Sequence, residues 1–259
     1  MSWAILLLAF FVSSSALSYL AGSHKTHLID KIARGSRRDA AQVLANGGLA
    51  AFLVMIFALV NLHIVQDDAL TSISQVLSVS FSFSRIDQPL FFLAFAASLA
   101  AANADTWSTE IGVLSHSRPI LITSGRPVER GTSGGISILG IFAGLGGAAL
   151  IGFLASMMIW VGFEGGSSPG LAIYCVFFLV VTIGGLAGSL IDSLLGATLQ
   201  VIYFCPHCNK GTERHPYHTC GAQTIYKQGW RWFNNDWVNL ACTVSAAMAA
   251  ALLGLLSIF

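Results

Sequence analysis

Six long runs without a charged residue divide this sequence, and they constrain its fold more than any other feature. A helix needs about 20 apolar residues to cross the hydrocarbon core of a bilayer, with roughly 17 as the lower limit. The run between Asp87 and Asp105 is marginal unless its helix continues into Asp105. We therefore predict an all-α, polytopic membrane protein with about six transmembrane helices, within residues 2–23, 43–62, 88–104, 131–163, 165–191 and 237–259.

The composition supports a lipid-facing surface. Hydrophobic residues make up 55% of the chain and charged residues only 10%, whereas a soluble domain carries about a quarter charged residues. A formal net charge of +1 argues against nucleic acid as a partner, since that binding depends on cationic side chains. The first run lacks a basic region before it, so we interpret it as a retained span. Residues 1–259 are then one integral membrane domain.

The positions of lysine and arginine predict the topology. Twelve of the 13 Lys and Arg residues lie in three alternate connections, residues 21–42, 105–130 and 201–236. The positive-inside rule places such connections in the cytoplasm. Both termini are then outside. We expect a bacterial cell membrane, with a plastid membrane as the alternative.

Small residues recur at four-residue spacing in two of the predicted spans. Gly140, Gly144 and Ala148 lie in the fourth span, and Gly184 and Gly188 lie in the fifth. This spacing lets helix backbones approach closely in lipid. It predicts tight helix packing rather than a binding site.

Acidic residues gather at the predicted cytoplasmic ends of the spans. Asp105 and Asp192 sit at the hydrocarbon boundary, where an ionised group is costly unless it is paired, metal-bound or facing water. A single such Asp could simply reach headgroup water. Together with Asp236 and Glu110 they favour a shared cation site, and oxygen ligands favour Mg²⁺. Asp105 and Glu110 are roughly 140° apart on a regular helix, so either the helix breaks or Glu110 orients another group.

A glycine-rich stretch provides the second chemical element. Glycine allows backbone N–H groups to turn toward an anion, and a following helix N-terminus adds its dipole. Arg126 and Arg130 precede the glycines and can donate to phosphate oxygens. The stretch lacks the Walker A lysine pattern, and by itself it could be a flexible turn. The predicted phosphate-binding residues are Gly131, Thr132, Ser133, Gly134 and Gly135.

The last predicted cytoplasmic connection contains a cysteine and histidine knuckle, residues 203–222. Cys205 and Cys208 are separated by two residues, and Cys220 follows a short interval later. This is zinc-ligand spacing, and disulfides are not expected in the cytoplasm. His218 or His215 would be the fourth ligand of a structural Zn²⁺. The alternative is three reduced thiols in a loop.

Six strings together carry a family resemblance, and they lie at residues 37–47, 103–112 (N-A-D-T-W-S-T-E-I-G), 121–123, 131–135 (G-T-S-G-G), 192–197 and 235–239. The chain resembles the family of transmembrane protein 19 and plant phytyl-phosphate kinase, in unchanged motif order from about residue 34 to 239. This resemblance implies an isoprenoid-phosphate kinase that converts phytyl monophosphate to the diphosphate with a nucleoside triphosphate.

A looser similarity links the chain to CTP-dependent phytol and dolichol kinases. It rests on Asp105, Gly112 and the Gly131-Thr132-Ser133 string. By this analogy Asp105 binds Mg²⁺ and residues 131–135, which we call the glycine loop, carry the nucleotide phosphates. The lysine of the kinase pattern is absent, and Arg130 stands nearest to its position.

The sequence thus favours phosphoryl transfer at the membrane surface, with a lipid phosphate, a nucleoside triphosphate and the membrane as partners. The alternatives are a small-solute or ion transporter and a non-catalytic scaffold that presents the knuckle. Transporters usually show internal repeats and midplane sites, which the sequence lacks. The predicted roles are catalysis for Asp105, Glu110, Arg126 and Arg130, Mg²⁺ binding for Asp105 and Asp192, and substrate binding for Arg37, Asn46, Asn235, Asp236 and Asn239.

Overall fold

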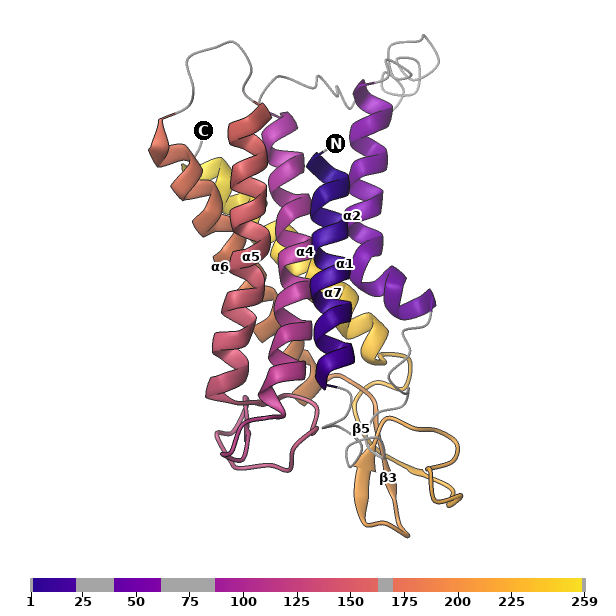
Figure 1. The fold of residues 1–259 in the computed structure, drawn as a ribbon. Coiled ribbons are helices and arrows are strands. Elements are labelled where there is room, and N and C mark those ends of the chain that lie inside the picture. Colours follow the sequence, from indigo (N-terminus) through magenta and orange to yellow (C-terminus); the bar gives the residue numbers. More distant parts are fainter. Residues whose placement is uncertain (1, 22–39, 62–86, 163–169, 258–259) are drawn as a thin grey trace.

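Six long helices form the body of the part of the protein that the structure describes (Figure 1). The computed structural model describes residues 2–21, 40–61, 87–162 and 170–257. Within these ranges each of the six helices is long and apolar enough to cross a membrane, which confirms the predicted fold. The third helix continues seven residues past Asp105. The uncharged run of residues 88–104, which is marginal in length, is therefore part of a helix long enough to span the membrane. The helices are α1 (Ser2–Ala21), α2 (Ala40–Asn61), α4 (Asp87–Gly112), α5 (Ile138–Gly162), α6 (Leu171–Thr198) and α7 (Asn235–Ser257).

Helix α4 is the centre of the bundle. It packs against α1, α2, α5, α6 and α7, and 67% of its spanning segment is buried, compared with 11% for that of α2. Residues 95–104 of α4 are all buried, and most of them are alanine or serine. Small side chains let several helices approach one central helix closely. Residues 103–112, at the end of this helix, are thereby held in one position by their neighbours.

The glycine spacing marks close helix contacts. A methyl group on Gly188 of α6 would lie 2.8 Å from the Cβ of Ala101 in α4 and 2.9 Å from the carbonyl oxygen of Cys242 in α7. A methyl group on Gly140 of α5 would lie 3.0 Å from the carbonyl oxygen of Ser108. All three distances are shorter than ordinary van der Waals contact. The backbones therefore meet at these glycines, as the spacing predicted.

We expect Gly188→Ala to destabilise the bundle by about 1–3 kcal/mol, the usual cost of adding a methyl group to a full core. The measurement is the thermal unfolding midpoint of the purified protein in detergent. Gly47→Ala in α2 is the matched control, since nothing lies within 4 Å of the added methyl group. An unchanged midpoint for Gly188→Ala would contradict the packing described here.

The two long described connections lie at the same end of the bundle. Residues 113–137 join α4 to α5, and residues 199–234 join α6 to α7. The start of α1 and the end of α7 lie at the opposite end (Figure 1). This arrangement agrees with the alternation predicted from lysine and arginine. We call the end that carries residues 113–137 and 199–234 the loop end.

Among the described residues, five short strands occur at the loop end, which the predicted all-α fold does not include. Strand β1 (Ile120–Leu121) pairs with β2 (Gly135–Ile136) in an antiparallel hairpin. Strands β3 (Ile202–Cys205), β4 (Lys210–Thr212) and β5 (Ile225–Gln228) form an antiparallel sheet in the order β4-β3-β5. We call residues 202–228 the strand module, and it encloses the predicted knuckle. The fold is mostly helical with these small additions.

Candidate functional site

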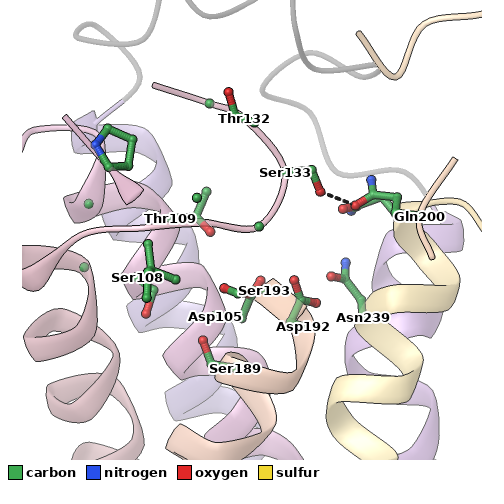
Figure 2. A pocket seen from close by; sticks show the side chains of 18 of the residues that line it. Asp105, Ser108, Thr109, Thr132, Ser133, Ser189, Asp192, Ser193, Gln200 and Asn239 are labelled. Atoms are coloured by element: carbon green, nitrogen blue, oxygen red, sulfur yellow. Dashed lines mark hydrogen bonds between the residues drawn. The ribbon is translucent and has the colours of Figure 1, made fainter. Parts of the chain in front are cut away.

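A cavity of about 440 Å³ opens at the loop end between α4, α5, α6 and α7. This volume is typical of small-molecule sites. Figure 2 shows side chains of α4, α6 and α7, together with Ser133 of the loop at residues 131–135, around the same space. The structure therefore brings together residues from four separate parts of the sequence. Of the predicted site residues, those that line the cavity are Asp105, Gly131, Thr132, Ser133, Gly134, Gly135, Arg130, Asp192, Asn235, Asp236 and Asn239.

Four carboxylates line this cavity: Asp236 at the start of α7, and three from other elements that interact with one another. Asp105 of α4 and Asp192 of α6 point into it (Figure 2), and Glu213 of the strand module also lines it. Asp192 is close enough to both of the others for electrostatic repulsion. Within the described part of the chain, the buried Oδ2 of Asp192 has no hydrogen-bond partner. Since clustered anions at a membrane boundary require compensation, the donor set fits a hard divalent cation such as Mg²⁺.

The glycine loop lies over these carboxylates. Gly131 and Gly134 have φ values of +76° and +77°, which favour glycine because a Cβ is strained there. The backbone N–H of Ile122, the residue after β1, donates to the carbonyl oxygen of Gly134 at 3.0 Å and holds the loop from one side. On the other side a methyl group on Gly134 would lie 2.7 Å from the Cα of Ala197 in α6. Glycine at 134 thus lets the loop rest directly on the last turns of α6.

Two helix N-termini also face the cavity. The Oγ of Ser137 accepts a hydrogen bond from the backbone N–H of Gly140 at 3.1 Å and so caps α5. The Oδ1 of Asn234 accepts hydrogen bonds from the backbone N–H groups of Asp236 and Trp237 at 3.0 and 3.3 Å and caps α7. Ser137 and Asn234 both line the cavity. Because a helix N-terminus carries partial positive charge, this arrangement favours bound phosphate groups.

The two predicted arginines have different positions. The Nη2 of Arg130 donates to the carbonyl oxygens of Ser115 and His116 at 2.6 and 3.2 Å. Arg130 also lines the cavity, and its hydrogen bonds join the two sides of the connection between α4 and α5. Arg126 is exposed and is not among the residues that line the cavity.

Three other predicted residues are not placed in the cavity. Glu110 faces α1, where the Oγ of Ser18 donates to its Oε1 at 3.0 Å. Helix α4 stays regular through Asp105. The carboxylates of Asp105 and Glu110 therefore point in different directions, as their spacing along the helix required. Asn46 of α2 is partly buried but does not line the cavity. Arg37 lies outside the described residues.

Gln200 is a site residue that the sequence analysis missed. Its side chain is only 1% exposed. The Oγ of Ser133 donates to its Oε1, and its Nε2 donates to the Oε1 of Glu213 at 2.7 Å. Gln200 therefore joins the glycine loop to the strand module. No local motif marks this glutamine, because its role depends on contacts between segments far apart in the chain.

Hydroxyl groups form much of the remaining polar wall, and the sequence analysis assigned them no role. Ser108 and Thr109 belong to the motif around Asp105, and Ser193 belongs to the motif around Asp192. Their positions within these two motifs were the sequence signal that could have identified them as site residues. The cavity residues of this kind are Ser108, Thr109, Ser137, Ser189 and Ser193, and Gln42 adds an amide from α2.

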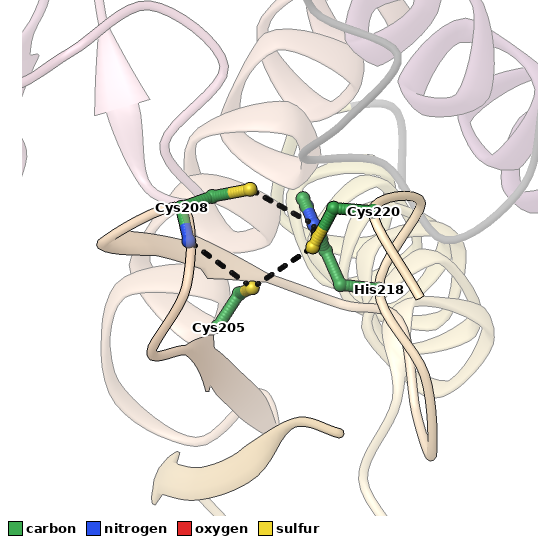
Figure 3. A group of neighbouring side chains, drawn as sticks. All are labelled: Cys205, Cys208, His218 and Cys220. Atoms are coloured by element: carbon green, nitrogen blue, oxygen red, sulfur yellow. Dashed lines mark hydrogen bonds between the residues drawn. The ribbon is translucent and has the colours of Figure 1, made fainter. Parts of the chain in front are cut away.

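The predicted knuckle forms a cluster that can bind a metal ion (Figure 3). The ligand atoms of Cys205, Cys208, His218 and Cys220 all lie within 4.8 Å of one another. The sequence left His215 and His218 as alternatives for the histidine. The structure selects His218, since the ring of His215 instead stacks on Tyr203 at 4.3 Å.

Hydrogen bonds within the cluster separate the acidities of two thiols. Burial favours the neutral form of Cys205, but hydrogen bonds from the backbone N–H of Cys208 and from the Cys220 side chain lower the pKa of Cys205 below 9.0. The hydrogen bond with Cys220, followed by burial, raises the pKa of Cys208 to about 11. Of these two thiols Cys205 is therefore the more acidic, and the thiolate is the form that binds metal.

Comparison with known proteins places the chain in a family. Protein PGR of Arabidopsis thaliana is 34% identical over 206 residues, which cover 79% of this chain and 67% of that protein. Uncharacterized membrane protein MJ0933 of Methanocaldococcus jannaschii is 40% identical over 108 residues, 42% of this chain and 40% of the relative. Protein VTE6, chloroplastic, of Arabidopsis thaliana is 32% identical over 172 residues, 66% of this chain and 39% of the relative.

The matched regions thus span between 39% and 67% of the length of these relatives. No solved structure matches the chain. The family described as integral membrane protein DUF92 matches residues 1–247. Because this match covers nearly the whole chain, the protein belongs to the integral membrane protein family DUF92, which confirms the relationship that the motifs indicated.

Proposed function

We propose that this protein is a prenyl monophosphate kinase that uses a nucleoside triphosphate, with phytyl phosphate as the type of substrate. One observation carries the proposal: Asp105 and Asp192 face the glycine loop and two helix N-termini across one cavity at the end of a membrane bundle. Such a site offers carboxylates for a cation and backbone donors for phosphates. The family resemblance to phytyl-phosphate kinase supports the same chemistry.

The reaction forms one bond to phosphorus and breaks another. An oxygen of the lipid monophosphate attacks the γ-phosphorus of the nucleotide, and the bond from that phosphorus to the β–γ bridging oxygen breaks. The products are the lipid diphosphate and the nucleoside diphosphate. Since the acceptor phosphate is already ionised, no general base is needed, and catalysis depends on positioning and charge neutralisation.

The cavity residues divide these tasks. Mg²⁺, when bound by Asp105 and Asp192, would neutralise charge on the triphosphate oxygens. The loop of residues 131–135 and the N-terminus of α5 would hold nucleotide phosphates through N–H and hydroxyl donors. The N-terminus of α7 would hold the lipid phosphate through Asn235 and Asn239. Arg130 would keep the loop in place and contribute positive charge.

The apolar part of the cavity suits a prenyl chain. Ile141 of α5 and Leu186 and Leu190 of α6 line it, and all three belong to membrane-spanning helices. A prenyl substrate would place its chain against these side chains and its phosphate against the polar wall. We propose that the loop end faces the cytoplasm, as the positive-inside rule requires, and that the Cys₃His cluster holds a structural Zn²⁺.

The position of the site argues against a transporter. Asp105 lies seven residues before the end of α4, and Asp192 lies six residues before the end of α6. Transporter sites typically lie near the middle of the bilayer between broken helices. A scaffold role would leave the carboxylates and the glycine loop without a purpose.

A direct assay tests the proposal. Purified protein in detergent is incubated with Mg²⁺, phytyl or geranylgeranyl phosphate, and CTP, ATP, GTP or UTP labelled in the γ-phosphate. We expect a labelled lipid diphosphate that disappears when Mg²⁺ is chelated. Absence of labelled product with all four nucleotides and both lipids, or solute flux in liposomes instead, would overturn the assignment.

A further inference from the structure

The strand module has almost no apolar core of its own. Across residues 202–228, all of which the structure describes, the buried side chains are Cys205, Thr212, His218 and Thr224. Segments shorter than about 40 residues usually need a metal, a disulfide or a partner to stay folded. Two of the four buried side chains belong to the Cys₃His cluster. The cluster is therefore the natural source of stability for the module.

Three of the six pairs of ligand atoms have spacings close to those of a tetrahedral zinc site, and all four ligand atoms lie within 4.8 Å of one another. The Sγ of Cys205 lies 3.6 Å from the Sγ of Cys220. The Nδ1 of His218 lies 3.5 Å from the Sγ of Cys208 and 3.2 Å from the Sγ of Cys220. Zinc bonds of about 2.0–2.3 Å hold tetrahedral ligand atoms about 3.3–3.8 Å apart. Four protein ligands leave no open position, so this metal would be structural.

Glu213 connects this cluster to the membrane cavity. It follows strand β4, midway between the ligands Cys208 and His218. Both neighbouring turns would be held by the same metal ion, so the position of Glu213 depends on it. At the other end of the side chain, buried Gln200 donates to its Oε1 at 2.7 Å. Glu213 and Asp192 both line the cavity, and their negative charges repel each other.

We infer that zinc bound at the Cys₃His site holds the strand module in the conformation that places Glu213 in the cavity. Glu213 would then be a ligand of the divalent cation in addition to Asp105 and Asp192. Gln200 is the positioning residue, because it aims Glu213 and holds Ser133 of the glycine loop at the same time. This inference rests on the proposed cation site and deepens it. Zinc in the strand module and the cation in the membrane cavity are thus two coupled metal sites.

The first experiment measures zinc in the purified full chain by elemental analysis. We expect about one zinc ion per chain in the unaltered protein, and loss of zinc in Cys208→Ser and His218→Ala. The matched control is His207→Ala, since His207 is exposed and lies outside the ligand set. Zinc retained in both ligand variants, or no zinc in the unaltered protein, would overturn the zinc assignment.

The second experiment measures the coupling with Mn²⁺ as a paramagnetic probe of the cavity, followed by electron paramagnetic resonance. We expect Glu213→Gln to weaken Mn²⁺ binding at least tenfold, and Gln200→Leu about 10–100-fold, the usual effect of losing a group that orients a ligand. Zinc content should stay unchanged in both variants. Glu129→Gln is the control, because Glu129 is an exposed carboxylate at the loop end. This variant should bind Mn²⁺ normally.

Zinc removal provides a test without a mutation. The protein is treated with a zinc chelator, the chelator is removed by gel filtration, and Mn²⁺ affinity is measured before and after zinc is restored. We expect affinity to fall at least tenfold and to recover with zinc. Unchanged Mn²⁺ affinity in Glu213→Gln or in zinc-free protein would overturn the coupling. Phosphoryl transfer is not measured here, so failure of the kinase assay and failure of this inference are separate results.

Discussion

Asp105→Asn protein is expected to lose more than about 100-fold of its phosphoryl-transfer activity, because even groups that merely support a metal ligand contribute 10–100-fold. Asparagine keeps the shape of the side chain but removes the charge that would attract the cation. It also relieves repulsion with Asp192. We therefore expect the variant to remain folded, with a thermal midpoint equal to or above that of the unaltered protein.

The measurement is turnover of the preferred nucleotide and lipid phosphate, with Mn²⁺ affinity determined on the same preparation. Asp192→Asn should behave in the same way, since its carboxylate faces the same space. Glu129→Gln is the control for removal of a carboxylate at the loop end, and its turnover should be normal. Turnover of Asp105→Asn within a few-fold of the unaltered protein would exclude Asp105 as the centre of the site.

Gly134→Ala is expected to lower turnover by about 100-fold, which is the usual cost of a displacement of about 1 Å in a catalytic group. Two effects act together at this position. The φ value of +77° strains any residue with a Cβ, typically by about 1–3 kcal/mol. The added methyl group would also lie 2.7 Å from the backbone of Ala197, so the loop must move away from α6 and from its hydrogen bond to Gln200.

A matched variant separates these two effects. Gly125 has a similar φ value of +64°, but nothing lies within 4 Å of an added methyl group. Gly125→Ala therefore introduces the strain without the collision, and its turnover should fall much less. The measurements are turnover and binding of the nucleotide at several concentrations. Equal losses in both variants would show that loop contact with α6 has no part in catalysis.

The helical fold could be predicted from the sequence because transmembrane spans are encoded locally. Each span needs enough consecutive apolar residues, and each connection carries its own charge pattern. The third span shows the limit of counting charges. Asp105 ended the uncharged run, yet α4 continues to Gly112, because packing by the other helices and the polar cavity accommodate that carboxylate.

The candidate site was predictable only in part. Asp105, Asp192 and the glycine loop each stand in a recognisable string, so the sequence identified them separately. Glu110 stands in the same string as Asp105 but contacts Ser18 of α1, since it projects from another side of the helix. Distance along the sequence says little about which residues share a cavity.

The sequence by itself determined the six spans, the small-residue contacts between them, and the types of residue able to bind a cation, a phosphate and zinc. These properties depend on composition and short spacing, which hydropathy and side-chain chemistry express directly. Only the tertiary structure selected His218 over His215, and only it placed buried Gln200 between Ser133 and Glu213. The physical reason is that those contacts join segments separated by many residues, and their geometry exists only after the helices have packed.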